Sequence, residues 1–132
     1  MKLYLDSSAI VKLVQRERES ASLQRFLRRH KTSERVTSAL ARVEVVRAVL
    51  PGGPKAIAHA RRQLGRLYQI ALDRELLDHA ATLSSAVRLR SLDAVHLASA
   101  QVLGSDLQAV VTYDQRMEEA ATSLGLAVEA PC

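Results

Sequence analysis

Four carboxylates are the side chains of this sequence best suited to do chemistry: Asp6, Glu44, Asp93 and Asp114. Asp6 and Asp114 each follow a short apolar run that is typical of a buried strand. Because residues just beyond the carboxyl ends of parallel strands line the crevice where ligands bind, these two acids should face one crevice. Glu44 and Asp93 lie on predicted helices that can lean over the same edge. Such a pocket would suit Mg²⁺ and the phosphate oxygens of a substrate.

Each of the four acids also has an ordinary structural explanation. Asp6 and Asp114 stand where helix N-caps are expected, and Asp93 in a first turn would suit the helix dipole. Glu44 lies in an apolar stretch, where an unpaired carboxylate is costly, so we expect either Arg47 at i+3 or a metal ion beside it. The structural explanation is better for any one acid taken alone. The four together favour a metal site.

The elements that would position these acids alternate between strands and helices. Apolar patterning predicts strands over 2–5, 35–37, 68–72, 109–112 and 126–128. Helical spacing predicts a helix that follows Asp6 and others over 20–29, 39–50, 55–67, 74–87, 92–102 and from Asp114 onward, with Ser38, Asp73 and Ser91 as caps. This order predicts an α/β protein, a three-layer α/β/α sandwich with a mostly parallel central sheet. Because the length suits one core and no linker is visible, residues 1–132 are expected to form a single domain.

The composition is typical of a globular cytoplasmic protein with an anionic partner. Hydrophobic residues make up 48% of the chain, and 19 Lys and Arg against 14 Asp and Glu give a net charge of +5. The lone Cys132 excludes an internal disulfide and a zinc cluster, which fits a reducing compartment. No run approaches the roughly 18–20 apolar residues of a membrane span. With only 3% aromatic residues, contacts to RNA would depend on charge. The candidates for such contacts are Arg25, Arg28, Arg29, Lys31, Arg61, Arg62 and Arg66.

The segments that carry the acids also match a known family. Residues 3–9 read LYLDSSA, Glu44 lies in its helix, residues 92–100 read LDAVHLASA, and residues 111–114 read VTYD. In this order they resemble the PIN-domain ribonucleases, and bacterial VapC toxins in particular, over essentially the whole chain. The resemblance implies a metal-dependent endoribonuclease that hydrolyses RNA phosphodiester bonds. It would act as the toxin of a type II toxin–antitoxin pair and inhibit translation or growth.

The same resemblance implies roles for the acids and a set of partners. Asp6, Glu44, Asp93 and Asp114 would be catalytic, with the three aspartates as ligands of Mg²⁺, for which Mn²⁺ can substitute. Glu44 would complete the cluster and help to place the attacking water. The implied partners are an RNA substrate, a cognate VapB-like antitoxin and a second copy of the chain in a homodimer.

Four further polar residues lie close to the acids in the sequence. Ser8 and Thr112 match polar positions of the family, and their hydroxyls would orient Asp6 and Asp114, although Ser8 is equally suited to capping. His96, one turn after Asp93, is expected to be a packed core histidine rather than a general base. Glu118 is expected to be solvated charge on a surface helix.

Two other functions compete with the nuclease. A catalytically inactive PIN-like module that binds RNA or a protein would keep the fold and need no metal. A phosphatase with an aspartyl nucleophile needs a second Asp two residues after the first, and Ser8 stands at that position. The phosphatase is therefore disfavoured, and metal-dependent cleavage of RNA distinguishes the nuclease from the inactive module.

Overall fold

The computed structural model describes residues 1–132, and a five-stranded sheet lies at its centre. Its strands are β1 (Lys2–Leu5), β2 (Glu34–Ser38), β3 (Tyr68–Ile70), β4 (Leu107–Val111) and β5 (Val128–Glu129). They lie in the order β3-β2-β1-β4-β5, and every neighbouring pair is parallel. The prediction of a mostly parallel sheet is confirmed, and the sheet is in fact wholly parallel.

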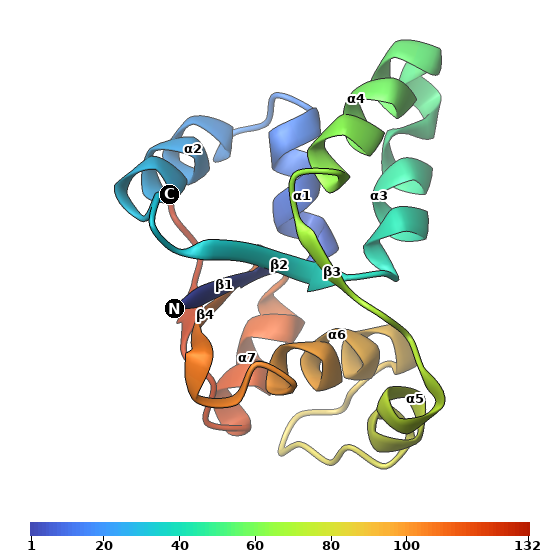
Figure 1. The fold of residues 1–132 in the computed structure, drawn as a ribbon, viewed down its shortest axis with the longest axis vertical. Coiled ribbons are helices and arrows are strands. Elements are labelled where there is room, and N and C mark those ends of the chain that lie inside the picture. The colour runs from blue at the N-terminus through green and yellow to red at the C-terminus, as the bar shows by residue number, and fades with distance from the viewer.

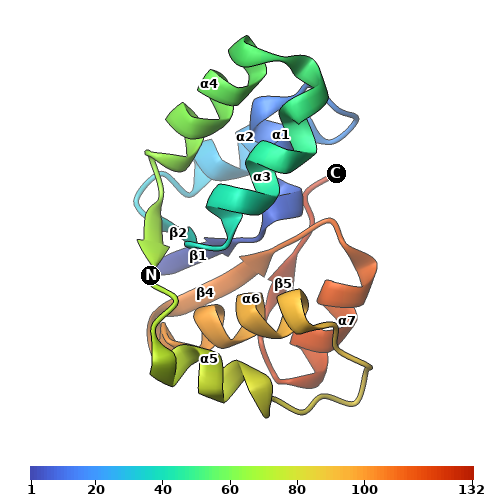
Figure 2. The same ribbon diagram turned by 90° about the vertical axis from the view of Figure 1, so that its right-hand side faces the viewer.

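Seven α-helices cover the two faces of this sheet (Figures 1 and 2). They are α1 (Ser7–Val14), α2 (Ser20–Arg29), α3 (Ala41–Val49), α4 (Pro54–Leu64), α5 (Arg74–Ala81), α6 (Ser91–Gln101) and α7 (Gln115–Ser123). Both views place the first four helices on one side of the sheet and the last three on the other. The three-layer α/β/α sandwich predicted from the sequence is confirmed.

Strand β1 shows how the sheet joins the two helical layers. Its side chains alternate between the two faces of the sheet. Leu3 and Leu5 therefore belong to the core between the sheet and α1–α4, whereas Tyr4 belongs to the core between the sheet and α5 and α6. All three are fully buried, as expected for the central strand of a parallel sheet covered on both sides. The one polar atom among these side chains is the Tyr4 hydroxyl, which therefore needs a partner inside the protein.

Several predicted boundaries and caps were wrong. Helix α5 ends at Ala81 instead of residue 87, and residues 82–90 form an irregular connection. There the Ser85 hydroxyl accepts a hydrogen bond from the Val87 backbone N–H, a local bond that competes with the helix. Ser91 is the first residue of α6 rather than its cap, and Arg90 takes the cap position without a side-chain hydrogen bond. Ser38 ends β2 and does not cap α3, which begins at Ala41.

The direction of chain winding reverses beside β1. From β1 the chain goes outward to β2 and β3, then crosses back to β4 and continues to β5 on the other side. In open parallel sheets such a reversal opens a crevice at the carboxyl ends of the two central strands. Leu5 pairs with Val111 at this edge, so the residues that follow β1 and β4 leave the sheet side by side.

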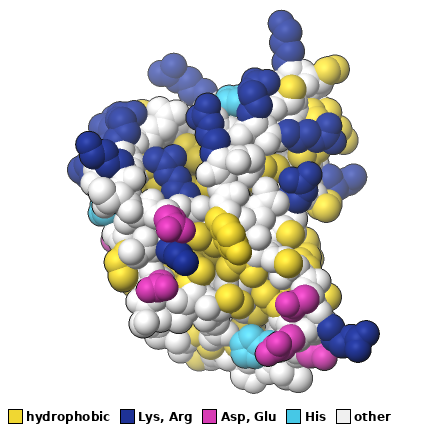
Figure 3. Space-filling model, in the orientation of Figure 1, with side chains coloured by type: hydrophobic (Ala, Val, Ile, Leu, Met, Phe, Trp, Pro, Cys, Tyr) yellow, Lys and Arg dark blue, Asp and Glu magenta, His cyan; other side chains and the backbone are white.

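Charge is distributed unevenly over the layers. Residues 20–67, from the start of α2 to the end of the loop after α4, contain eleven Lys and Arg but only two Glu. Figure 3 shows these cations gathered over the upper part of the molecule, on the side of α2 and α4. The layer above the sheet is therefore strongly basic. Helices long and apolar enough to cross a lipid bilayer are absent from the structure.

Candidate active site

A cavity of about 280 Å³ lies at the carboxyl ends of β1 and β4. All four acids singled out in the sequence line it: Asp6, Glu44, Asp93 and Asp114. They come from the end of β1, from α3, from α6 and from the start of α7, so the fold brings together residues that are up to 108 positions apart. The rest of the lining is mostly polar and consists of Ser7, Ser8, Arg90, Ser91, Leu92, His96 and Met117.

Asp6 forms the floor of the cavity. Its Oδ1 accepts hydrogen bonds from the Ala9 backbone N–H at 3.0 Å and from the Ser8 hydroxyl at 2.6 Å, and its Oδ2 accepts one from the Thr112 hydroxyl. The same Thr112 oxygen accepts the backbone N–H of Asp114 at 3.1 Å. Ser8 and Thr112 thus hold the Asp6 carboxylate from two sides, and Thr112 links it to the loop that carries Asp114.

Asp93 and Asp114 face each other across a guanidinium group. Arg90 Nε donates to Asp93 Oδ2 at 2.9 Å, and Arg90 Nη2 donates to Asp114 Oδ2 at 3.2 Å. Asp114 also caps α7, because its Oδ1 accepts the backbone N–H groups of Arg116 and Met117. Oδ1 of Asp114 therefore caps α7, and Oδ2 faces the cavity.

Glu44 reaches the cavity from the opposite helical layer. Its Oε1 accepts hydrogen bonds from the Ser7 hydroxyl at 2.7 Å and from His96 Nε2 at 2.6 Å. His96 Nδ1 lies 2.7 Å from the buried Tyr4 hydroxyl. Arg47 makes no ion pair with Glu44, so the pairing expected from their i,i+3 spacing is absent. His96, not Arg47, is the partner of this carboxylate.

The surroundings shift the pKa values of Asp6 and Glu44 in opposite directions. Burial raises the pKa of Asp6 above 3.8, although His96 and the hydroxyls of Ser8 and Thr112 partly offset this effect. Partial burial would also raise the pKa of Glu44, but the hydrogen bonds from His96 and Ser7 outweigh it and lower the pKa below 4.5. Burial therefore disfavours the ionised form of Asp6, whereas the partners of Glu44 favour its ionised form.

The direction of the hydrogen bonds at His96 follows from these charges. Because an ionised Glu44 can only accept, His96 Nε2 must carry the proton in that bond. In a neutral ring Nδ1 is then an acceptor, and the Tyr4 hydroxyl donates to it. Burial, together with the negative charge of Asp6, holds the pKa of Tyr4 well above 10.0, so this hydroxyl keeps its proton. These hydrogen bonds connect Tyr4, His96 and Glu44 in a row that extends from the core to the cavity.

Sequence reasoning missed two residues of the site. His96 was interpreted as a core residue, and it is 97% buried, yet it also lines the cavity. Its i,i+3 spacing from Asp93 was the available signal, since this spacing puts both on one face of α6. Arg90 lies three residues before Asp93, and this spacing likewise indicated that the two side chains would be neighbours. Glu118 does not line this cavity and faces a separate hollow beside Glu19 and Tyr113.

The arrangement of the acids as they stand does not yet form a metal cage. No three acidic or histidine side chains are grouped closely enough to hold one ion together. In this arrangement Arg90 contacts one oxygen each of Asp93 and Asp114, and both oxygens of Asp6 accept hydrogen bonds. The donor set itself consists of carboxylate oxygens only, which are the ligands preferred by hard cations such as Mg²⁺ and Mn²⁺.

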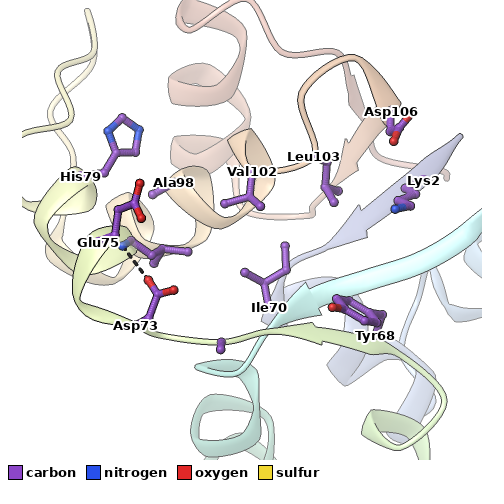
Figure 4. Close-up of a pocket in the computed structure, with 12 residues that line it drawn as sticks. Lys2, Tyr68, Ile70, Asp73, Glu75, His79, Ala98, Val102, Leu103 and Asp106 are labelled. Atoms are coloured by element: carbon purple, nitrogen blue, oxygen red, sulfur yellow. Dashed lines mark hydrogen bonds between the residues drawn. The ribbon is translucent and has the colours of Figure 1, made fainter.

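A second hollow, of about 550 Å³, lies at the other edge of the sheet between β3, α5 and the end of α6 (Figure 4). Ile70, Val102 and Leu103 give it an apolar floor. Of its acids, Asp73 caps α5 through the Leu76 backbone N–H, the bond drawn in Figure 4. The acids of this hollow do not converge as those at β1 and β4 do, so the smaller cavity is the better candidate for an active site.

Comparison with known proteins agrees with this geometry. Residues 3–122 match the model of the PIN domain family. Two Mycobacterium tuberculosis proteins, ribonuclease VapC46 and ribonuclease VapC35, are 54% and 43% identical to this chain. The alignments cover 98% of this chain and 97% and 96% of those proteins. The crystal structure of M. tuberculosis VapC20, a sarcin-ricin loop cleaving toxin, superimposes with a TM-score of 0.76 over 99% of this chain and 100% of VapC20, at 18% identity. The chain belongs to the PIN-domain family and, within it, to the VapC ribonucleases.

Proposed function

We propose that this chain is an endoribonuclease that hydrolyses RNA phosphodiester bonds with a bound Mg²⁺ or Mn²⁺ ion, as the toxin of a toxin–antitoxin pair. The observation that carries the proposal is the convergence of Asp6, Glu44, Asp93 and Asp114 on one cavity at the reversal of the sheet. The identity to two VapC ribonucleases over nearly their whole length supports the same activity.

The side chains of the cavity divide into ligands and a water-positioning group. Asp6, Asp93 and Asp114 would hold the cation, directly or through water. When bound, such a cation lowers the pKa of its water and offsets charge on the phosphate during cleavage. Glu44 uses Oε1 for Ser7 and His96, which leaves Oε2 to accept a hydrogen bond from the attacking water.

The basic layer above the sheet offers a surface for the RNA backbone. Ten of the eleven cations between residues 20 and 67 are exposed, and that stretch carries nine more cations than anions. Helix α3 belongs to this layer, and it carries Arg47 as well as Glu44, which lines the acidic cavity. Phosphate contacts of this kind hold a nucleic acid without reading its sequence.

The assignment to a toxin–antitoxin pair implies two protein partners. A small VapB-like antitoxin would neutralise the nuclease, and a second copy of the chain would form a homodimer. We propose both partners because the chain belongs to the VapC ribonucleases. Size-exclusion chromatography with light scattering on the purified chain, alone and with the product of an adjacent antitoxin gene, tests them. A monomer that forms no complex would contradict both.

Cleavage of total RNA with and without Mg²⁺ or Mn²⁺ tests the enzyme function, with new 5′ ends mapped by sequencing. Asp6→Asn should abolish cleavage, because it keeps the shape of the side chain and removes its charge. Asp73→Asn is the matched control, since Asp73 also follows a strand and caps a helix but lies outside the cavity. Equal cleavage by the wild type and Asp6→Asn would refute the site, and RNA binding without metal-dependent cleavage would favour the inactive module.

A further inference from the structure

Arg90 is the only Lys or Arg that lines the acidic cavity, and it contacts two of the proposed metal ligands. It stands at the N-cap position of α6, where the irregular connection 82–90 ends. Its guanidinium donates to Asp93 Oδ2 and to Asp114 Oδ2, and thereby joins the start of α6 to the start of α7. The side chain of Arg90 is 54% exposed, whereas that of Asp93 is 9% exposed. The arginine therefore covers the acids from the solvent side.

This position makes Arg90 a competitor of a bound cation. The cavity holds four carboxylates and one guanidinium, so its lining carries an excess of negative charge even with Arg90 in place. A divalent ion that binds Asp93 Oδ2 and Asp114 Oδ2 needs the positions that the guanidinium now occupies. Two positive groups cannot share these two oxygens without strong repulsion. An ion bound in this way requires Arg90 to move away.

The location of Arg90 allows such a movement. Its side chain lies at the mouth of the cavity and is more than half exposed, so it can leave the acids without disturbing the core. Because its backbone is anchored at the start of α6, the released guanidinium stays next to the cavity. A guanidinium binds two oxygens of a phosphodiester in a fork, as it binds carboxylates. An RNA phosphate that enters the cavity would come within reach of this guanidinium.

We propose that Arg90 is an internal counter-ion of the acidic cavity that yields Asp93 and Asp114 to a divalent cation and then binds the substrate phosphate. The inference rests on the proposed function and extends it to a substrate-binding residue. It also explains why the four acids are compatible with a stable fold without metal, since Arg90 compensates part of their repulsion. One side chain would thus couple metal binding to RNA binding.

The first test measures Mn²⁺ binding without RNA, by electron paramagnetic resonance of the free ion. Arg90→Gln should bind Mn²⁺ about tenfold tighter than the wild type, because a positive charge next to the ligands is removed. Arg90→Lys should keep the charge and bind Mn²⁺ nearly as the wild type does. Arg88→Gln is the matched control, since Arg88 is exposed in the same connection and makes no ion pair. Equal or weaker Mn²⁺ binding by Arg90→Gln would overturn the counter-ion role.

The second test measures RNA cleavage at saturating Mn²⁺. Arg90→Gln should raise KM by about tenfold, with a smaller change in kcat. It should also reduce the slope of log(kcat/KM) against log[salt] by about 0.7, the value for one lost phosphate contact on a single strand. An unchanged KM and slope would overturn the phosphate role. If the wild type cleaves and Arg90→Gln behaves as Arg88→Gln in both tests, this inference alone fails. If the wild type does not cleave but Arg90→Gln binds Mn²⁺ more tightly, the proposed function fails and the counter-ion role stands.

Discussion

Replacing Tyr4 with Phe removes a single oxygen atom from the centre of the protein. The Tyr4 hydroxyl is fully buried in β1, and it donates to His96 Nδ1 at 2.7 Å. His96 is 3% exposed, so no water can replace the lost donor from bulk solvent. Phenylalanine fills nearly the same space as tyrosine, so the packing of the core around Tyr4 stays intact. The change therefore removes the hydrogen bond to His96 with little change in packing.

The magnitude of this effect follows from the unpaired acceptor. A buried polar atom left without a partner costs about 1–3 kcal/mol of unfolding free energy. For a chain of this length, about 1 kcal/mol corresponds to a shift of about 3–4 °C in Tm, so Tyr4→Phe should lower Tm by about 3–12 °C. The ring proton of His96 should stay on Nε2, because Glu44 still accepts a hydrogen bond from it.

Urea denaturation and long-range ¹H–¹⁵N NMR of the His96 ring test both consequences. In the wild type and in Tyr4→Phe the ring proton should reside on Nε2, because Glu44 accepts a hydrogen bond from it in both. Tyr113→Phe is the control, because the Tyr113 hydroxyl donates to the Pro131 carbonyl at 2.7 Å in a half-buried position that water can reach. A loss below about 0.5 kcal/mol for Tyr4→Phe, or one equal to that of the control, would refute the reasoning.

Three other changes probe the fold and the site. Burial raises the pKa of Asp6 in the folded state above 3.8. The metal-free protein should therefore lose stability as the pH rises from 3.8 through the raised pKa. Urea titrations from acidic to neutral pH should show this loss in the wild type and not in Asp6→Asn. Arg61→Glu with Arg62→Glu should raise KM for RNA by about tenfold or more and reduce its salt dependence, as cleavage assays at several salt concentrations will measure. Gly53→Ala should cost about 1–3 kcal/mol in urea denaturation, because Gly53 has φ 82° and ψ −169°, whereas no neighbour obstructs its Cβ. Equal stability of Gly53→Ala and the wild type would contradict that assignment of strain.

Local patterns were sufficient to predict most elements of the fold. Strand 2–5 and helix 20–29 were predicted with their observed bounds, because an apolar run before a capping Asp and a regular amphipathic spacing are both local signals. Helix α5 was predicted six residues too long. Residues 82–87 keep apolar side chains at helical intervals, but the Ser85 hydroxyl accepts a hydrogen bond from the local backbone instead. Hydrophobic periodicity does not detect that competition.

The partners of the acids were harder to predict than the acids themselves. Glu44 and His96 are 52 positions apart and lie in opposite helical layers, so only the complete fold brings them to one edge of the sheet. The nearby Arg47 was the natural guess, because sequence reasoning can count i,i+3 neighbours but not tertiary ones. Arg90 and Asp93 form the one i,i+3 ion pair of the site, and this pair was within reach of such counting.

Asp6 and Asp114 both cap a helix in the structure, and their separate oxygens leave room for the proposed role as metal ligands. Asp114 caps α7 with Oδ1 and turns Oδ2 into the cavity toward Arg90. Asp6 likewise caps α1 with Oδ1, while its Oδ2 meets the Thr112 hydroxyl. Asp73 caps α5 in the same way, yet no neighbour engages its other oxygen. Because capping fixes the carboxylate but needs only one oxygen, an aspartate after a strand at the sheet reversal can hold the helix and present a ligand at once. The two explanations that compete for Asp6 and Asp114 in the sequence are therefore compatible in the structure.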